Sequence, residues 1–66
     1  MMENLAEALP KEQERVRVIL GYYKEIPQGI FGATMIESAL KRADKAAASG
    51  DVVSMLVSYK ELRDIE

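Results

Sequence analysis

An enzyme built from this sequence would have to use carboxylates, lysines or tyrosines, because the 66 residues include no histidine and no cysteine. Those absences exclude imidazole and thiolate metal ligands, cysteine nucleophiles and histidine-based triads. A catalytic pair of carboxylates needs two acids held together in an apolar cleft. Glu12 with Glu14, and Asp64 with Glu66, are two residues apart and would point to different sides of a helix. We therefore expect no catalytic residue, no cofactor site and no metal site.

Basic residues gather in two parts of the chain and raise the alternative of nucleic-acid binding. Lys11 and Arg15 lie early in the sequence, and Lys41, Arg42 and Lys45 form a second group. If two helices brought both groups to one face, the patch would suit phosphate groups. Acidic residues lie among the second group, and the isoelectric point is near 5.1. These five residues are the candidates for a nucleic-acid site.

A segment rich in aromatic, glycine and proline residues occupies the middle of the chain and holds two of the three tyrosines and the only phenylalanine. Tyr22 is a candidate protein-interface residue, because a tyrosine combines apolar area with a polar tip. The alternative is structural. Tyr23 and Phe31 would then close the end of a helical bundle, while Gly29 and Gly32 would let the chain turn and the helices approach.

Val53 and Val57 are four residues apart and fall outside the apolar stripe expected for their helix. In so small a protein, self-association or a protein partner explains a second apolar strip better than chance does. Isolated exposed valines are also normal on soluble proteins, which is the competing interpretation. Val53 and Val57 therefore join Tyr22 as interface candidates.

The residues before and after these candidates indicate which helices must position them. The first helix is expected to start near Pro10, because the missing N–H of a proline costs nothing in the first helical turn. Pro27 disfavours a helical conformation in the residue before it, so this helix is expected to end around Glu25. Between them runs an apolar stripe with helical spacing, made of Val16, Ile19, Leu20, Tyr23 and Ile26.

Two more helices follow. Small or apolar residues recur with helical spacing from residue 32 to residue 47, and a third stripe consists of Val52, Met55, Leu56, Tyr59 and Leu62. Gly50 suits the left-handed end of a helix, and Asp51 suits the start of the next one. Ala39, Ala43 and Ala47 recur every four residues and would allow close helix packing, within one molecule or across a two-fold axis.

Three amphipathic helices with short connecting turns predict an all-α protein, an up-down-up three-helix bundle. Residues 1–9 are expected to form an N-terminal tail or a frayed helical turn, and residues 10–66 a single domain. The expected core contains large apolar side chains from all three helices: Leu20, Tyr23, Phe31, Ile36, Leu40, Leu56, Tyr59 and Leu62.

Several stretches together carry a likeness that extends over nearly the whole chain. Among them are Leu9-Pro10-Lys11-Glu12-Gln13, Gly21-Tyr22-Tyr23-Lys24-Glu25-Ile26-Pro27 and Ser49-Gly50-Asp51. In these residues the sequence resembles short uncharacterised helical proteins of bacterial and prophage genomes. That group has no assigned activity, so the resemblance implies no catalytic or binding residues. It does imply an origin in a phage or mobile element.

Charge and hydropathy indicate where in the cell the protein is expected. The formal net charge is −2 with 30% charged residues, which is ordinary for a soluble protein. The N-terminal residues lack the pattern of a signal peptide, and no apolar run is long enough to span a bilayer, so we expect a cytoplasmic protein without a membrane partner. The function expected is a small non-enzymatic protein-interaction module, acting as a homodimer or with another protein.

Overall fold

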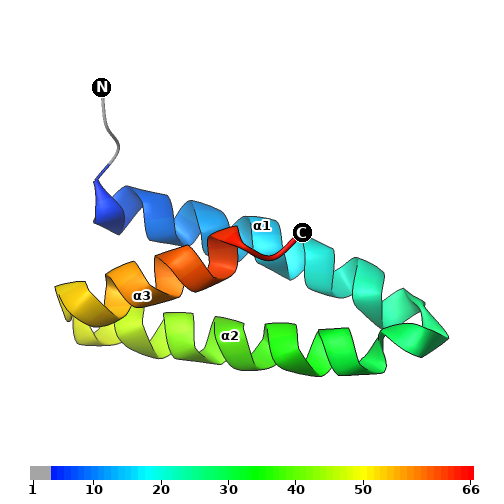
Figure 1. The fold of residues 1–66 in the computed structure, drawn as a ribbon. Helices are drawn as coiled ribbons and strands as arrows, with labels where there is room; N and C mark the ends of the chain where they lie inside the picture. Colours follow the sequence, from blue (N-terminus) through cyan, green and yellow to red (C-terminus); the bar gives the residue numbers. More distant parts are fainter. Residues whose placement is uncertain (1–3) are drawn as a thin grey trace.

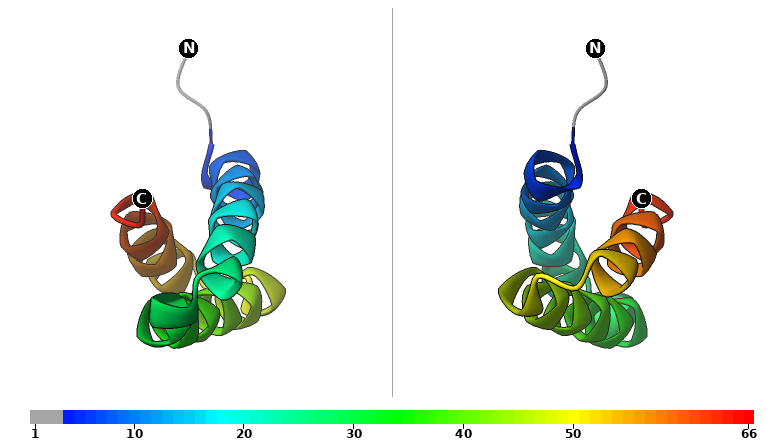
Figure 2. Two further views of the ribbon diagram at one scale, coloured as in Figure 1. Left: turned by 90° about the vertical axis from the view of Figure 1, so that its right-hand side faces the viewer. Right: turned by 90° about the vertical axis from the view of Figure 1, so that its left-hand side faces the viewer.

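The computed structural model describes residues 4–66, and three α-helices dominate them. Helix α1 spans Leu5–Glu25, α2 spans Ile30–Ser49 and α3 spans Val52–Arg63, with the short 3-10 helix η1 at Pro27–Gly29 between α1 and α2 (Figure 1). The helices run up, down and up, and viewed from either end α1 and α3 both lie against α2 (Figure 2). The predicted all-α three-helix bundle is therefore confirmed.

Helix α1 begins five residues before the expected start. The side chain of Asn4 accepts a hydrogen bond from the Glu7 N–H at 3.0 Å, which caps the first turn, and Leu9 is fully buried. Pro10 lies inside the helix and cannot donate to the carbonyl of Ala6. The expectation of a tail or frayed turn was therefore wrong for residues 5–9, because capping and burial outweigh the proline. Residues 1–3 of that segment lie outside the described residues.

The turn between α1 and α2 depends on two glycines that pack against Tyr23. A Cβ atom on Gly32 would lie 2.6 Å from two ring carbons of Tyr23, and one on Gly29 would collide with the Tyr23 carbonyl oxygen. The Tyr23 hydroxyl donates to the carbonyl of Glu66 at 3.3 Å. The structural role expected of these glycines is confirmed.

The turn between α2 and α3 follows the local sequence. Gly50 adopts the left-handed conformation, with φ of 70°, and donates its N–H to the Ala46 carbonyl. Asp51 occupies the N-cap position of α3, as expected, but its carboxylate accepts from the Ser54 hydroxyl at 2.6 Å instead of from the backbone.

The core is small and is lined on α2 largely by alanine. Its buried residues are Leu9, Val16, Ile36, Ala39, Leu40, Ala43 and Leu62, and the partly buried residues packed against them are Ile19, Leu20, Tyr23, Met55, Tyr59 and Ile65. The small residues of α2 allow α1 and α3 to approach it closely. Of the alanine strip, Ala47 is exposed, whereas Ala39 and Ala43 pack inside the molecule.

Two of the eight expected core residues are wrong. Phe31 is 83% exposed, because α3 has only 12 residues and ends before reaching the start of α2. Leu56 is 43% exposed, because α3 turns Met55 and Ser58 toward its neighbours, and one residue rotates a helix by about 100°. Apolar spacing alone did not distinguish these orientations.

Candidate protein-interaction surfaces

More large apolar side chains are exposed on the surface of this molecule than are buried in its core. Among residues 4–66, five apolar side chains larger than alanine are buried: Leu9, Val16, Ile36, Leu40 and Leu62. Ten are exposed: Val18, Tyr22, Ile26, Ile30, Phe31, Met35, Val52, Val53, Leu56 and Val57. Eight of these ten fall into two groups.

The first group, the valine surface, consists of Val52, Val53, Leu56 and Val57 on the outer side of α3. The spacing of these residues places them next to one another on the first two turns of the helix. Two of the three candidate interface residues, Val53 and Val57, belong to it. Their exposure agrees with the sequence pattern, and their role in an interface stays a prediction.

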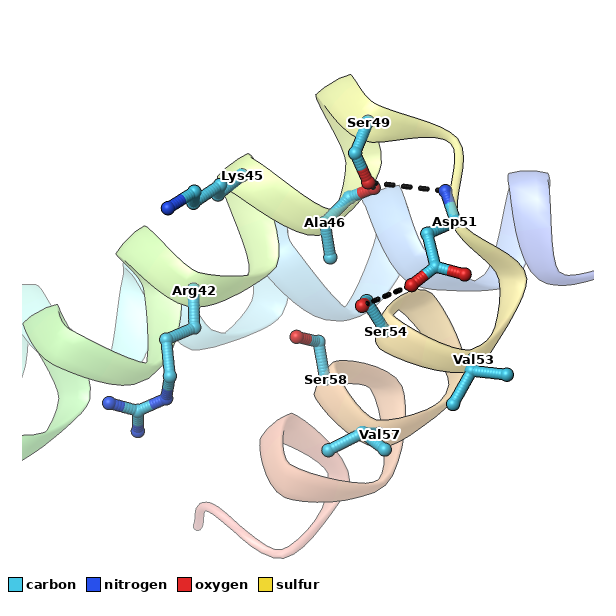
Figure 3. Close-up of a pocket in the computed structure, with 9 residues that line it drawn as sticks. All are labelled: Arg42, Lys45, Ala46, Ser49, Asp51, Val53, Ser54, Val57 and Ser58. Carbon is cyan, nitrogen blue, oxygen red and sulfur yellow. Dashed lines mark hydrogen bonds between the residues drawn. The ribbon is translucent and has the colours of Figure 1, made fainter.

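A groove of about 510 Å³ runs beside the valine surface, between α2 and α3 (Figure 3). Its α2 wall carries Arg42 and Lys45, and its α3 wall carries Val53 and Val57. Ser58 is buried between the helices with its hydroxyl directed into the groove. Both walls of the groove therefore combine polar and apolar groups, and the basic ones lie on α2.

The Asp51 carboxylate lies at one end of this groove. The hydrogen bond from the Ser54 hydroxyl favours the charged carboxylate and lowers the pKa of Asp51. The Ser49 hydroxyl accepts from the Asp51 N–H at 3.1 Å and donates to the Ala46 carbonyl at 2.8 Å. The polar groups at this end thus bond one another and order the turn.

The second group, the hairpin-end surface, consists of Tyr22 from α1, Ile26 directly after α1, and Phe31 and Met35 from α2. It includes the third candidate, Tyr22, which lies near η1, whereas the valine surface adjoins the turn between α2 and α3. The structure therefore places the three candidates at opposite ends of a molecule whose longest dimension is 38 Å. Phe31, Met35 and Ile26 were not among the candidates.

A second groove, of about 330 Å³, adjoins the hairpin-end surface. Tyr23, Gly32, Met35, Ile36 and Ala39 form its α1 and α2 side, and the C-terminal residues close the other side. Its apolar floor is bordered by charged side chains, among them Arg42 and Glu61, so both grooves combine apolar and polar groups.

The basic residues of the nucleic-acid alternative are partly engaged inside the molecule. The Arg15 guanidinium bonds the Glu12 carboxylate at 2.8 Å and donates to the carbonyls of Leu62 and Ile65 at 2.8 and 2.9 Å, at the end of α3. Arg42 makes two hydrogen bonds to Glu61, which raise the pKa of the Arg42 guanidinium. Both guanidinium groups thus tie a long helix to α3.

The three lysines of this alternative, Lys11, Lys41 and Lys45, are exposed. Lys45 lines the groove of Figure 3 together with Arg42. Acidic side chains accompany the basic ones on both long helices, as Asp44 bonds Arg17 at 2.7 Å and Glu37 lies 3.8 Å from Lys24. The charges of both signs are therefore interleaved.

Comparisons with known proteins identify no relative. No family model matches the chain, and neither a curated protein nor a solved structure does. Within residues 4–66, none of the helices has both the length and the apolar character needed to cross a membrane. Nor do those residues bring three or more acidic side chains together as a metal site would require.

Proposed function

We propose that this protein is a non-enzymatic protein-interaction module that associates with itself. The observation that carries the proposal is the ratio of ten exposed to five buried large apolar side chains among residues 4–66. Burying apolar surface is the main favourable term in both folding and association. A chain that exposes twice as many large apolar side chains as it buries gains stability when a second molecule covers them.

The grouping of these side chains supports the same proposal. Scattered apolar residues on a surface are ordinary, whereas contiguous patches mark interaction sites. Here they form the valine surface and the hairpin-end surface. The small core also favours association, because a domain of this size has little stability of its own to lose and much to gain from a partner.

Sedimentation velocity of the full chain over a range of micromolar concentrations tests this proposal. We expect a mass that rises with concentration from the 7.4 kDa of one chain toward twice that value. Added salt should not dissociate the assembly, because apolar contacts are not screened. A single species with the mass of one chain at every concentration would contradict self-association.

A further inference from the structure

The two long helices extend beyond the third one. Helices α1 and α2 contain 21 and 20 residues, and α3 contains 12. At ~1.5 Å per residue, α3 is ~12 Å shorter than either long helix. Figure 1 shows that α3 and the C-terminal residues stop well before η1. The end of the α1/α2 hairpin therefore lacks a third helix.

The side chains facing that missing position can be identified from the contacts of α3. On α1, Arg15 bonds the carbonyls at the end of α3, and Tyr22 lies seven residues further toward η1. Seven residues are close to two helical turns. Tyr22 therefore continues, past the end of α3, the line of residues that starts at Arg15, and Ile26 follows directly after α1 in an extended conformation.

The same relation holds on α2. Arg42 pairs with Glu61 of α3, and Met35 and Phe31 lie seven and eleven residues before it, again toward η1. Met35 also lines the second groove, which places this pair beside the apolar floor. The hairpin-end surface thus lies where the lines of residues through Arg15 and Arg42, which contact α3, continue beyond its end.

We infer that the hairpin-end surface is the site of self-association, where a second copy of this chain packs about a two-fold axis. This inference rests on the proposed function and names the surface that serves it. The Phe31 ring of each copy then enters the groove beside Met35 in the other copy. A projecting side chain and a groove at the same end make the surface self-complementary, as a two-fold contact requires.

The exposed apolar area of the hairpin-end surface is consistent with a second copy of the chain as the partner that covers it. An aromatic side chain buries ~150–250 Å² in all, and a large aliphatic one ~60–120 Å². The four side chains of this surface are between 52% and 83% exposed, so together they offer ~400 Å². A standard interface buries ~800 Å² on each side, about 65% of it apolar in homodimers. The surface therefore supplies most of the apolar area that a homodimer of this size needs.

Composition distinguishes this surface from the valine surface. Interfaces are enriched in tyrosine, phenylalanine and methionine, and the hairpin-end surface contains all three. Valine, serine and lysine are not enriched, and these three types make up most of the valine surface and of the lining of its groove.

Charge substitution at matched exposed positions tests the inference. Phe31→Lys should raise the dissociation constant of the dimer by at least ~30-fold, because interface residues at the centre dominate affinity. Val57→Lys, at the opposite end, should leave that constant unchanged. Both side chains are exposed, so circular dichroism should show unaltered helicity in each variant.

A fluorescence reporter provides an independent measurement, since the chain contains no tryptophan. In a Phe31→Trp variant, the emission maximum should move to shorter wavelength as concentration rises through the dissociation constant. In a Val57→Trp variant it should stay constant. If the dimer persists in Phe31→Lys and dissociates in Val57→Lys, the surface is wrongly assigned and self-association still holds. If wild type remains a monomer throughout, both proposals fail.

Discussion

At the scale of single residues, Gly21 and Gly32 show how the surroundings decide the effect of one methyl group. Both lie within helices and neither has a positive φ. A Cβ on Gly21 would have no neighbour within 4 Å, whereas a Cβ on Gly32 would lie 2.6 Å from the Tyr23 ring. The Tyr23 ring is held in turn by its hydrogen bond to Glu66.

Gly21→Ala should therefore stabilise the protein by ~0.5–1 kcal/mol, because alanine loses less backbone entropy in a helix. Gly32→Ala should destabilise it by ~1–3 kcal/mol, because the ring must move. Urea denaturation of both variants at one fixed concentration measures the difference. Equal effects of the two substitutions would show that Tyr23 does not pack on Gly32 as described.

Leu40 and Leu56 form a second pair at this scale. Leu40 is buried in the core, and Leu56 is 43% exposed. Leu40→Ala should cost ~2–5 kcal/mol of unfolding free energy, which is a large part of what so small a domain has. Leu56→Ala should cost ~1 kcal/mol or less. Loss of helicity in Leu56→Ala as complete as in Leu40→Ala would place Leu56 in the core after all.

At the scale of the elements, α3 is held at its C-terminal end by a side chain of α1. The Arg15 guanidinium donates to two carbonyls there, and a lysine cannot reproduce that planar arrangement of donors. Arg15→Lys should lower stability by ~1–2 kcal/mol and speed hydrogen exchange at the end of α3. The matched Arg17→Lys, which changes only an exposed ion pair with Asp44, should cost ~0.5 kcal/mol or less. Indistinguishable exchange in the two variants would argue against this role of Arg15.

The N-terminal end of α3 should lose stability at low pH. The pKa of Asp51 is lowered by the Ser54 hydroxyl, so the folded carboxyl group binds a proton less readily than the unfolded one. The bond therefore stabilises α3 above the unfolded pKa, and that contribution is lost as pH falls through the folded pKa. A carboxyl titration by NMR should give a higher pKa in Ser54→Ala than in wild type. An unchanged pKa of Asp51 in that variant would show that the Ser54 hydroxyl does not lower it.

At the scale of the whole molecule, the distribution of charge bears on the nucleic-acid alternative. The net charge is −2, and Arg15 and Arg42 are both bonded to partners on other parts of the chain. We expect no binding of labelled single-stranded or duplex DNA or RNA at low salt, measured by fluorescence anisotropy. Binding that weakens steeply with salt, and further in Lys41→Glu or Lys45→Glu, would instead establish a phosphate-binding patch.

The elements themselves follow from short stretches of the sequence. Pro27 ends α1, Gly50 adopts the left-handed conformation, and Asp51 starts α3 because these backbone preferences act within a few residues. Apolar spacing likewise indicates three helices without reference to the rest of the fold. The start of α1 is the exception: Asn4 is a local N-cap signal that the prediction from Pro10 did not include, and the burial of Leu9 by residues distant in sequence has no local signal.

Which side of each helix is covered, and for how far, was decided by the tertiary structure. The third apolar stripe covers only about eleven residues, and its shortness was the one signal in the sequence that the hairpin end would stay uncovered. Apolar spacing fits a buried Phe31 as well as an exposed one, since spacing defines a face and not the partner that meets it. The separation of Tyr22 from Val53 and Val57 likewise depends on how the helices pack. Burial is a property of pairs of elements, and for this chain it depends on the reach of α3 along the other two helices.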